Sequence, residues 1–428
     1  MSILILTVGG SCEPLVNAIS KEDPEFVYFV CSSGSKGSQR AVDGQGKPCK
    51  EYMEGKETSK PSIVEQTELE KELYEKWELS DPDSLAHCYE RLLELAKEIR
   101  KRFGAKNPRI IANYTGGTKT MSVALALVAM IEEDWELQLN KGPRTDLVKV
   151  RGGDVPILIN KWEVFANHVL TSIKESLCRY DYSGAAELAY AALRHPLSEE
   201  RQAQFQRIYA LSKGFEAWDR FDHKEAYILI TPFAKDFVDH KIALESFLGK
   251  RRKPSGYELV GDLIRNAERR AVQGRYDDAV ARLYRALELF AQIRLKDVLG
   301  IEWSPTSSSK DREEKTALQL SLEHIPEALR VKYKDKLEKG MLKLGLFQDF
   351  ELLADLKDPV ADYFKQKEKT LREALKKRNY SILAHGLIPL NQREYKEVYN
   401  HVVGFIKESA QRLKIDIDIP QLPMDFCE

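Results

Sequence analysis

Residues 109–120 read RIIANYTGGTKT, and this stretch carries the strongest indication of the fold. Its apolar first half predicts a strand over 109–114, because near-continuous apolar runs are typical of strands covered on both faces. The segment 121–133 that follows has the composition of a helix. A buried strand that passes through paired glycines into a helix indicates the repeating unit of an open α/β sheet.

The rest of the N-terminal part extends the same alternation. Two more near-continuous apolar runs predict strands at 3–8 and 26–31. Segments with helical spacing and many charges separate these strands. We expect helices at 66–79, 81–103 and 121–133, and further strands at 135–140, 147–151 and 156–160. Residues 1–160 are therefore predicted to form an α/β domain of Rossmann type.

The three predicted strands all end in short polar segments that contain glycine or serine. In an open α/β sheet the ligand lies outside the carboxyl ends of the strands. Glycines let backbone N–H groups approach a ligand closely, hydroxyls donate hydrogen bonds, and a helix N-terminus favours anions. We therefore predict a site for a phosphate-containing small molecule, formed by Gly9, Gly10, Ser11, Ser32, Ser33, Thr115, Gly116, Gly117, Thr118 and Lys119.

Two familiar phosphate-binding patterns do not fit these loops. A P-loop needs a glycine five residues before its second glycine, but Ala112 stands there relative to Gly117, and Thr118 intervenes before Lys119. The loop after the first strand lacks the GxGxxG dinucleotide pattern. The alternative interpretation is that the glycines only make tight turns. Residues 34–62 are rich in Gly, Ser, Lys and Pro, which predicts a long mobile loop that is either a lid or an insertion without a role.

Composition limits the classes of protein to consider. A length of 428 residues predicts two or three domains, and a net charge of −1 means that binding to nucleic acid must come from local patches. The six cysteines form no CxxC pair, which argues against a zinc module or a disulfide framework and fits a reducing cytoplasm. No apolar stretch is long enough to span a membrane, and the N-terminus does not have the pattern of a signal peptide.

Beyond residue 160 the pattern is helical throughout. We expect a helical linker domain at 161–255, with helices at 162–178, 183–194, 199–219, 223–236 and 240–249. A second helical domain is expected at 256–428, with a loop at 303–314 and helices at 277–298, 326–343, 348–355 and 359–377. The sequence Arg-Tyr-Asp occurs at 179–181 and again at 275–277. This echo does not have the 34-residue period of a tetratricopeptide array.

The stretch 378–386, RNYSILAHG, is the strongest candidate for catalysis. It follows a basic run, because residues 365–378 hold seven Lys or Arg against two Glu. On a helix, Arg378 and His385 share a face. Arginine is a permanent cation that binds phosphate through two hydrogen bonds, and histidine transfers protons near neutral pH. Asn379 adds an amide that orients the histidine or binds a phosphate oxygen.

These residues predict the cutting of RNA without a metal ion. The alternative is that an Arg and a His seven residues apart arise by chance, and that the basic run is a solvated helix face. One Arg–His pair also supplies few groups for catalysis, which needs a base for the 2′-hydroxyl, an acid for the leaving 5′-oxygen and charge stabilisation. Two pairs that meet across a two-fold axis supply a fuller site, so we predict a homodimer with a composite active site.

The order of these features resembles the CARF–HEPN accessory ribonucleases of type III CRISPR systems. The loop TGGTK at 115–119 is similar to the ligand loop of CARF domains, and Arg378, Asn379 and His385 fit the HEPN signature with six intervening residues, at the long end of its range. The resemblance implies a CARF dimer that binds cyclic oligoadenylate, and a HEPN dimer that cuts single-stranded RNA without metal, leaves a 2′,3′-cyclic phosphate and needs no cofactor. In this class the CARF pocket can also cleave its activator slowly.

Other functions remain open at this point. The main alternative is a non-enzymatic nucleotide sensor whose helical half binds a partner, and the substitution His385→Ala separates the two hypotheses. A ligand-responsive transcription factor needs a helix-turn-helix, for which 161–255 offers no convincing candidate. A stand-alone HEPN toxin leaves the N-terminal site unexplained.

Overall fold

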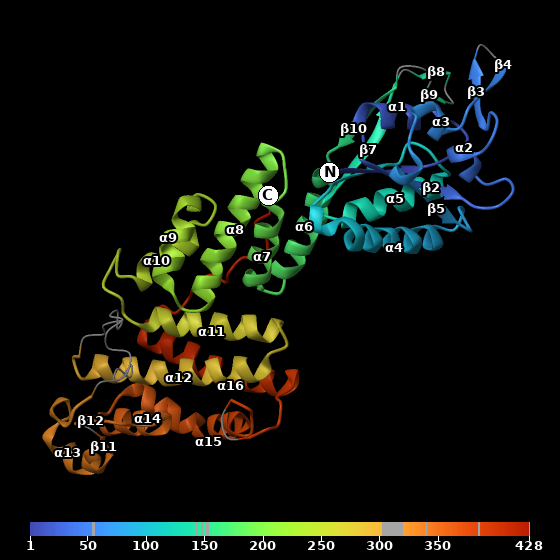
Figure 1. Ribbon diagram of the computed structural model, residues 1–428. Coiled ribbons are helices and arrows are strands. Elements are labelled where there is room, and N and C mark those ends of the chain that lie inside the picture. The colour runs from blue at the N-terminus through green and yellow to red at the C-terminus, as the bar shows by residue number, and fades with distance from the viewer. Residues whose placement is uncertain are drawn as a thin grey trace. The chain divides into compact units, whose positions relative to one another are not determined.

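The structure is a computed structural model that describes residues 1–428 except 54–55, 143, 147–148, 151–153, 302–319, 339, 384–385 and 428. The chain divides into two compact units, Met1–Asn167 and residues 168–428 (Figure 1). The first boundary lies close to the one predicted at residue 160. The predicted separation of 161–255 from 256–428 stays a prediction, because the second unit extends across that boundary without a division.

The first unit is built on a six-stranded sheet with the strand order β5-β2-β1-β6-β7-β10 (Figure 1). Neighbouring strands are parallel except that β10 runs antiparallel to β7. The bounds of the strands are β1 Ser2–Thr7, β2 Phe26–Ser32, β5 Tyr74–Leu79, β6 Arg109–Asn113, β7 Trp135–Lys141 and β10 Val155–Ile159. The predicted α/β class of the N-terminal part is confirmed.

The central strand β1 is buried on both faces, as its apolar run predicted. Ile3 and Ile5 pack with residues of α4 (Leu85–Phe103) and α5 (Lys119–Ile131). Leu4 and Leu6 point the other way because side chains alternate along a strand, and they pack with α1 (Glu13–Glu22) and α3 (Ile63–Thr67). Helices on both faces are what a parallel sheet requires.

Two predictions for this unit are wrong. Residues 66–79 were expected to be helical, but their second half is β5, which pairs with β2 along its whole length. Charges at Glu75, Lys76 and Glu78 hid the strand, because β5 is an edge strand and keeps half of its surface in water.

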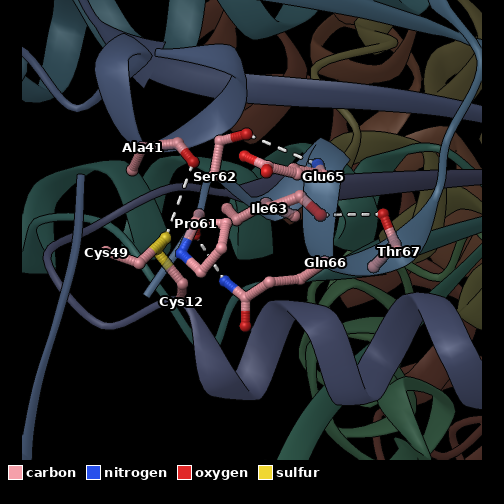
Figure 2. Close-up of a disulfide and its surroundings, with 9 residues drawn as sticks. All are labelled: Cys12, Ala41, Cys49, Pro61, Ser62, Ile63, Glu65, Gln66 and Thr67. Carbon is pink, nitrogen blue, oxygen red and sulfur yellow. Dashed lines mark hydrogen bonds between the residues drawn. A yellow bond between two sulfur atoms is a disulfide. The ribbon is translucent and has the colours of Figure 1, made fainter. Parts of the chain in front are cut away.

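Residues 34–62 were expected to form a long loop, but they contain regular structure. The segment holds α2 (Gln39–Asp43) and an antiparallel pair of strands, β3 (Cys49–Met53) and β4 (Lys56–Lys60). A disulfide joins Cys49 to Cys12, whereas the scattered cysteines had argued against a disulfide framework (Figure 2). The sequence could not show this pair, since two cysteines separated by 37 residues carry no recognisable spacing. A further short hairpin pairs β8 (Arg144–Asp146) with β9 (Lys149–Val150). Strand β9 lies within the strand expected at 147–151, whose other residues lie outside the described ones.

The second unit begins with helical hairpins. Its helices up to residue 298 are α6 Lys161–Leu177, which starts in the first unit, α7 Tyr182–Ala192, α8 Glu199–Asp219, α9 His223–Ile230, α10 Val238–Phe247, α11 Tyr257–Val272 and α12 Tyr276–Val298. The pairs α7·α8, α8·α9 and α11·α12 pack against one another. The predicted helices of this region are confirmed, except that the one at 223–236 already leaves the α-helical form after Ile230.

The last helices surround one apolar core with α12. They are α13 Glu327–Tyr333, α14 Leu346–Asp355, α15 Pro359–Asn379 and α16 Gln392–Leu413. At its centre Phe350 of α14 stacks on Phe364 of α15 with 3.9 Å between ring centroids. The helix expected at 326–343 is wrong in its second half, where β11 (Leu337–Glu338) pairs with β12 (Met341–Leu342). The loop expected at 303–314 lies outside the described residues.

A C-terminal tail follows α16 and runs back across the hairpins. Its backbone carbonyls accept hydrogen bonds from side chains of earlier helices, namely Arg265 to Ile419 O, Tyr182 to Pro423 O and Gln204 to Cys427 O. Phe426 is buried against Tyr182 and Phe215. The tail therefore joins helices of 161–255 to helices of 256–428. Among the described helices, none combines the length and the apolar character needed to cross a membrane.

Candidate functional sites

The predicted ligand loops lie where the order of the sheet reverses. From β1 the chain adds β2 and β5 on one side, and later adds β6 and β7 on the other side. The crevice at such a switch point is the usual ligand site of open α/β sheets. The loops after β1 and β6 are neighbours there, because β1 pairs with β6.

Three of the predicted glycines are brought into contact by these two loops. A Cβ on Gly116 would lie 2.2 Å from the Thr7 carbonyl oxygen, and a Cβ on Gly9 would lie 2.8 Å from the Gly117 nitrogen. Gly117 also has a φ of +81°, which disfavours any side chain. The Thr7 hydroxyl donates a hydrogen bond of 2.7 Å to the Gly116 carbonyl. These glycines are thus required by close packing of the loops, whatever ligand they bind.

Helix α5 starts at this edge. The Thr118 hydroxyl caps it by accepting a hydrogen bond from Met121 N at 3.2 Å, and it donates its proton to the Pro82 carbonyl at 2.8 Å. Lys119, the first residue of the helix, is exposed. An exposed cation beside unsatisfied N–H groups at a helix N-terminus forms a favourable place for an anion.

A buried polar network that the sequence analysis did not identify supports the Thr115 loop. Asn113 donates to Gln138 and to Asn140, each at 2.8 Å, and Asn140 N donates to the Thr115 hydroxyl at 2.7 Å. Asn140 also donates to the buried carboxylate of Asp154 at 2.6 Å. The polar side chains along β6 and β7 could have indicated this network from the sequence, since amides in buried strands nearly always have hydrogen-bond partners.

The remaining predicted ligand residues have different surroundings. Ser32 exchanges hydrogen bonds with Ser38, and Ser33 N donates to the Leu79 carbonyl at 3.0 Å, so both serines connect β2 to its neighbours. Gly10 is exposed and a Cβ there would meet nothing within 4 Å. Ser11 directly precedes Cys12, whose disulfide to Cys49 lies beside the Pro61–Thr67 turn of α3 (Figure 2).

Arg378 lies in the last turn of α15, where its guanidinium is held against an aromatic ring. Its Cζ stands 4.3 Å from the centroid of the Tyr284 ring of α12, a cation–π contact. The Arg378 Nε is buried and has no hydrogen-bond partner in the described part of the chain. An oriented guanidinium with an unpaired N–H is suited to receive a phosphate oxygen.

A buried carboxyl acts electrostatically on Tyr284, the ring that contacts Arg378. Asp349 of α14 is fully buried, and neither of its oxygens has a hydrogen-bond partner within the described residues. Burial raises the pKa of the Asp349 carboxyl well above its ordinary range, Glu288 raises it further, and Arg285 opposes the shift. Burial, Glu288 and Asp349 likewise raise the pKa of Tyr284, and the charge of Arg378 opposes this shift. The sequence analysis missed Tyr284 and Asp349, because each looks like an ordinary residue of its helix.

The motif does not lie on one continuous helix, which corrects the expected shared face. Helix α15 ends at Asn379, whose side chain is exposed, and the chain then turns back so that Ile388 N donates to the Tyr380 carbonyl at 3.0 Å. Asn379 and Ser381 favour a helix end over a helix interior, since their side chains compete for backbone hydrogen bonds. His385 lies outside the described residues.

The turn that contains the motif presents apolar side chains to solvent. The exposed apolar residues of this turn are Tyr380, Ile382, Leu383, Leu387 and Ile388. We refer to these five residues as the motif patch. Leu387, with an exposed fraction of 87%, and its neighbours form an apolar surface that soluble monomers rarely leave uncovered.

The switch-point loops of the α/β unit and the arginine of the helical unit are the two features on which the sequence resemblance to the CARF–HEPN accessory proteins of type III CRISPR systems rests. Residues 249–409 match the family model of the Csm6 HEPN domain. Enterococcus italicus Csm6 bound to cyclic hexa-2'-fluoro-hexa-dAMP has a similar structure, with a TM-score of 0.59 and 14% identity over 95% of this chain and 94% of that one. No curated protein matches the chain in sequence. The resemblance inferred from the sequence is confirmed, as is the fold of an α/β domain followed by a helical region with a HEPN domain.

Proposed function

We propose that the protein is an endoribonuclease that cuts single-stranded RNA when cyclic oligoadenylate binds to its N-terminal unit. The observation that carries the proposal is the geometry of Arg378. Within a stretch that matches a Csm6 HEPN domain, its guanidinium rests on Tyr284 and keeps a buried N–H unpaired. A structural arginine would be expected to have this N–H satisfied by a protein acceptor.

The chemistry follows from the residue types. The His385 imidazole of one protomer takes the proton of the ribose 2′-hydroxyl, whose oxygen then attacks the adjacent phosphorus. The bond from phosphorus to the 5′-oxygen breaks, and this oxygen takes a proton from the second imidazole. Arg378 holds the charged phosphate oxygens during the attack. The products are a 2′,3′-cyclic phosphate and a free 5′-hydroxyl, and no step in this scheme uses a metal ion.

This scheme requires a homodimer, because each protomer supplies a single motif. The motif patch supports the proposal, since it places exposed apolar side chains on both sides of the motif's histidine position in the sequence. Helix α5 carries a second apolar stripe, Val123, Leu127 and Ile131, with all three side chains exposed. A second copy of the chain that covers both surfaces would bring like residues together across a two-fold axis.

The N-terminal loops support an oligoadenylate as the activator. The solved structure that this fold resembles is of a protein bound to a cyclic hexanucleotide analogue. In this chain, Lys119 and the N-terminus of α5 offer a positive site for phosphate, beside the closely packed glycines of the two loops. Binding favours the active dimer if the ring has higher affinity for that arrangement. Slow cleavage of the activator in this same site forms part of the proposal.

Nuclease assays with labelled single-stranded RNA test the proposal. We expect cleavage in EDTA when a cyclic oligoadenylate of the correct ring size is added, and products that carry a 2′,3′-cyclic phosphate. His385→Ala and Arg378→Gln should each lower the cleavage rate by about a hundredfold or more while calorimetry shows unchanged activator binding. Lys376→Gln, which removes a charge from the same basic run, is the matched control and should keep the activity.

Two outcomes would contradict this proposal. If the wild-type protein binds a cyclic oligoadenylate but never cuts RNA, the chain is a nucleotide sensor whose helical unit binds a partner. If Lys376→Gln loses as much activity as Arg378→Gln, general attraction of RNA explains the role of the arginine.

A further inference from the structure

Two hairpins of the second unit share a turn with the sequence Arg-aromatic-Asp. The sequence occurs at 179–181, 220–222 and 275–277. Only the first two make this turn, because at the third Gly274 has the left-handed φ angle and Arg275 is the N-cap of α12. Tyr180 and Phe221 have left-handed φ angles of 55° and 65° that close one helix. Asp181 and Asp222 then cap the next helix by accepting from Gly184 N and Glu225 N, each at 3.0 Å. The aromatic residue and the aspartate thus make the turn, and the arginine is not required for it.

The first of these turns and the start of α12 border the same cavity. A cavity of about 460 Å³ is lined by the first turn, by the ends of α8 and α11, and by the start of α12. Three arginines from three elements, Arg179, Arg270 and Arg275, are among the residues that line it. A volume of this size is typical of small-molecule sites.

Two of the three carboxylates that line the cavity are neutralised by basic side chains, and the third, Asp181, accepts a hydrogen bond from Gly184 N as the cap of α7. Asp219 accepts from Arg269 Nε at 2.7 Å and also pairs with Arg270. Glu216 pairs with Lys213 and Arg220. The acidic lining residues therefore leave little free capacity to bind a cation.

Two residues that line the cavity each have a buried polar atom without a hydrogen-bond partner among the described residues. Arg270 is 7% exposed, and its Nε has no partner among the described residues. The Gln273 amide nitrogen donates to the Arg179 and Tyr180 carbonyls, which leaves its buried Oε1 without a donor. Arg179 makes no ion pair within the described part of the chain. A buried group without a partner costs free energy that a ligand can recover.

We propose that this cavity is a binding site for a small phosphate monoester that also carries hydroxyl groups. The phosphate is held by Arg179 and the free Nε of Arg270, and a hydroxyl of the ligand donates to Gln273 Oε1. Nucleoside monophosphates and sugar phosphates share this chemistry. The site is separate from the N-terminal loops and from Arg378, and it does not depend on the proposed nuclease activity.

Isothermal titration calorimetry on the full chain tests the site, with AMP, ribose 5-phosphate and inorganic phosphate as separate probes. We expect AMP, ribose 5-phosphate or both to bind the wild-type protein more tightly than inorganic phosphate, which lacks the sugar hydroxyls. Arg179→Gln should weaken this binding about tenfold or more, since a charge-assisted contact to phosphate is lost. Its side chain is exposed, so the variant is expected to fold, and a thermal melt verifies this.

Two control variants make the result specific. Arg220→Gln changes the equivalent residue of the second turn, which does not line this cavity. Glu216 keeps its ion pair with Lys213 in this variant, so the affinity should stay unchanged. Lys119→Gln changes the N-terminal site and should also have no effect. The proposal is overturned if the wild-type protein binds none of the probes up to about 5 mM. It is also overturned if Arg220→Gln weakens binding as much as Arg179→Gln, or if only Lys119→Gln weakens it.

Discussion

At the scale of residues, the position of Arg378 depends on a side chain from a distant part of the sequence. Tyr284 belongs to α12 and Arg378 to the end of α15, and the ring supports the guanidinium from one face. The last turn of a helix frays easily, because its carbonyl groups have no partner in the helix. The contact with Tyr284 restricts Arg378 to one orientation.

We therefore expect Tyr284→Ala to lower the rate of RNA cleavage about threefold to thirtyfold, which corresponds to the usual strength of a cation–π contact that is partly shielded from water. Tyr284→Phe keeps the ring and should retain most of the activity. Single-turnover kinetics at saturating RNA measures the rate, and a positioning role predicts a larger effect on kcat than on KM. Equal losses in both variants would show that the hydroxyl, and not the ring, is needed.

Asp349 predicts a dependence of stability on pH. Its pKa is raised in the folded protein, so the folded state holds the proton more tightly than the unfolded chain does. The free energy of unfolding must then fall as the pH rises above about 3.9, the pKa of an unperturbed Asp carboxyl. Asp349→Asn cannot ionise and avoids this loss. Its Tm should exceed that of the wild type near pH 8 and approach it near pH 4.

Thermal melts across this pH range measure the difference. The exposed Asp362 of α15 offers a matched control, because Asp362→Asn should shift Tm little at either pH. A constant offset between Asp349→Asn and the wild type would contradict the proposed role of ionisation.

At the scale of elements, the disulfide connects the β3–β4 hairpin to the loop that follows β1. Cys12 comes immediately before α1, and Cys49 begins β3. Through this bond the hairpin segment is attached to the edge of the sheet that carries the ligand loops. A disulfide stabilises the folded protein chiefly by restricting the conformations of the unfolded chain.

Cys49→Ser should lower the free energy of unfolding by about 2–4 kcal/mol, the usual contribution of a disulfide. Urea unfolding of the oxidised protein measures the change, and addition of a thiol reductant should destabilise the wild type by the same amount without affecting the variant. Cys178→Ser removes an exposed free cysteine and is the control. If reductant leaves the wild type unchanged, the bond does not form in solution.

The sequence predicted those elements whose patterns are local. The buried strands around β1 and most of the helices after residue 160 follow from apolar spacing alone, and helix α8 was predicted with its observed bounds. The strand β5 was missed because only its pairing with β2 identifies it. Glycine loops indicated the switch point, whereas Tyr284, Asp349 and Asn140 became recognisable only when distant helices and strands came together.

At the scale of the whole molecule, the motif patch predicts how activity depends on assembly. Leu387→Glu places a charge in the apolar surface that we assign to the dimer, so we expect monomers and a loss of RNA cleavage. Sedimentation velocity measures the first effect and a nuclease assay the second. Val331→Glu is a matched control, because Val331 of α13 is 84% exposed and lies outside the motif patch. A Leu387→Glu protein that remains dimeric and active would remove the patch from the proposed interface.

The C-terminal tail has a consequence for how the chain matures on the ribosome. Tyr182, Gln204 and Arg265 are synthesised long before Ile419, Pro423 and Cys427, whose carbonyls they need. A nascent chain stalled before residue 414 leaves these donors without partners and the ring of Phe215 without Phe426. Since domains usually fold as they emerge, the hairpins of this chain must wait in an incomplete state, and chaperones or proteases can act on them during that interval.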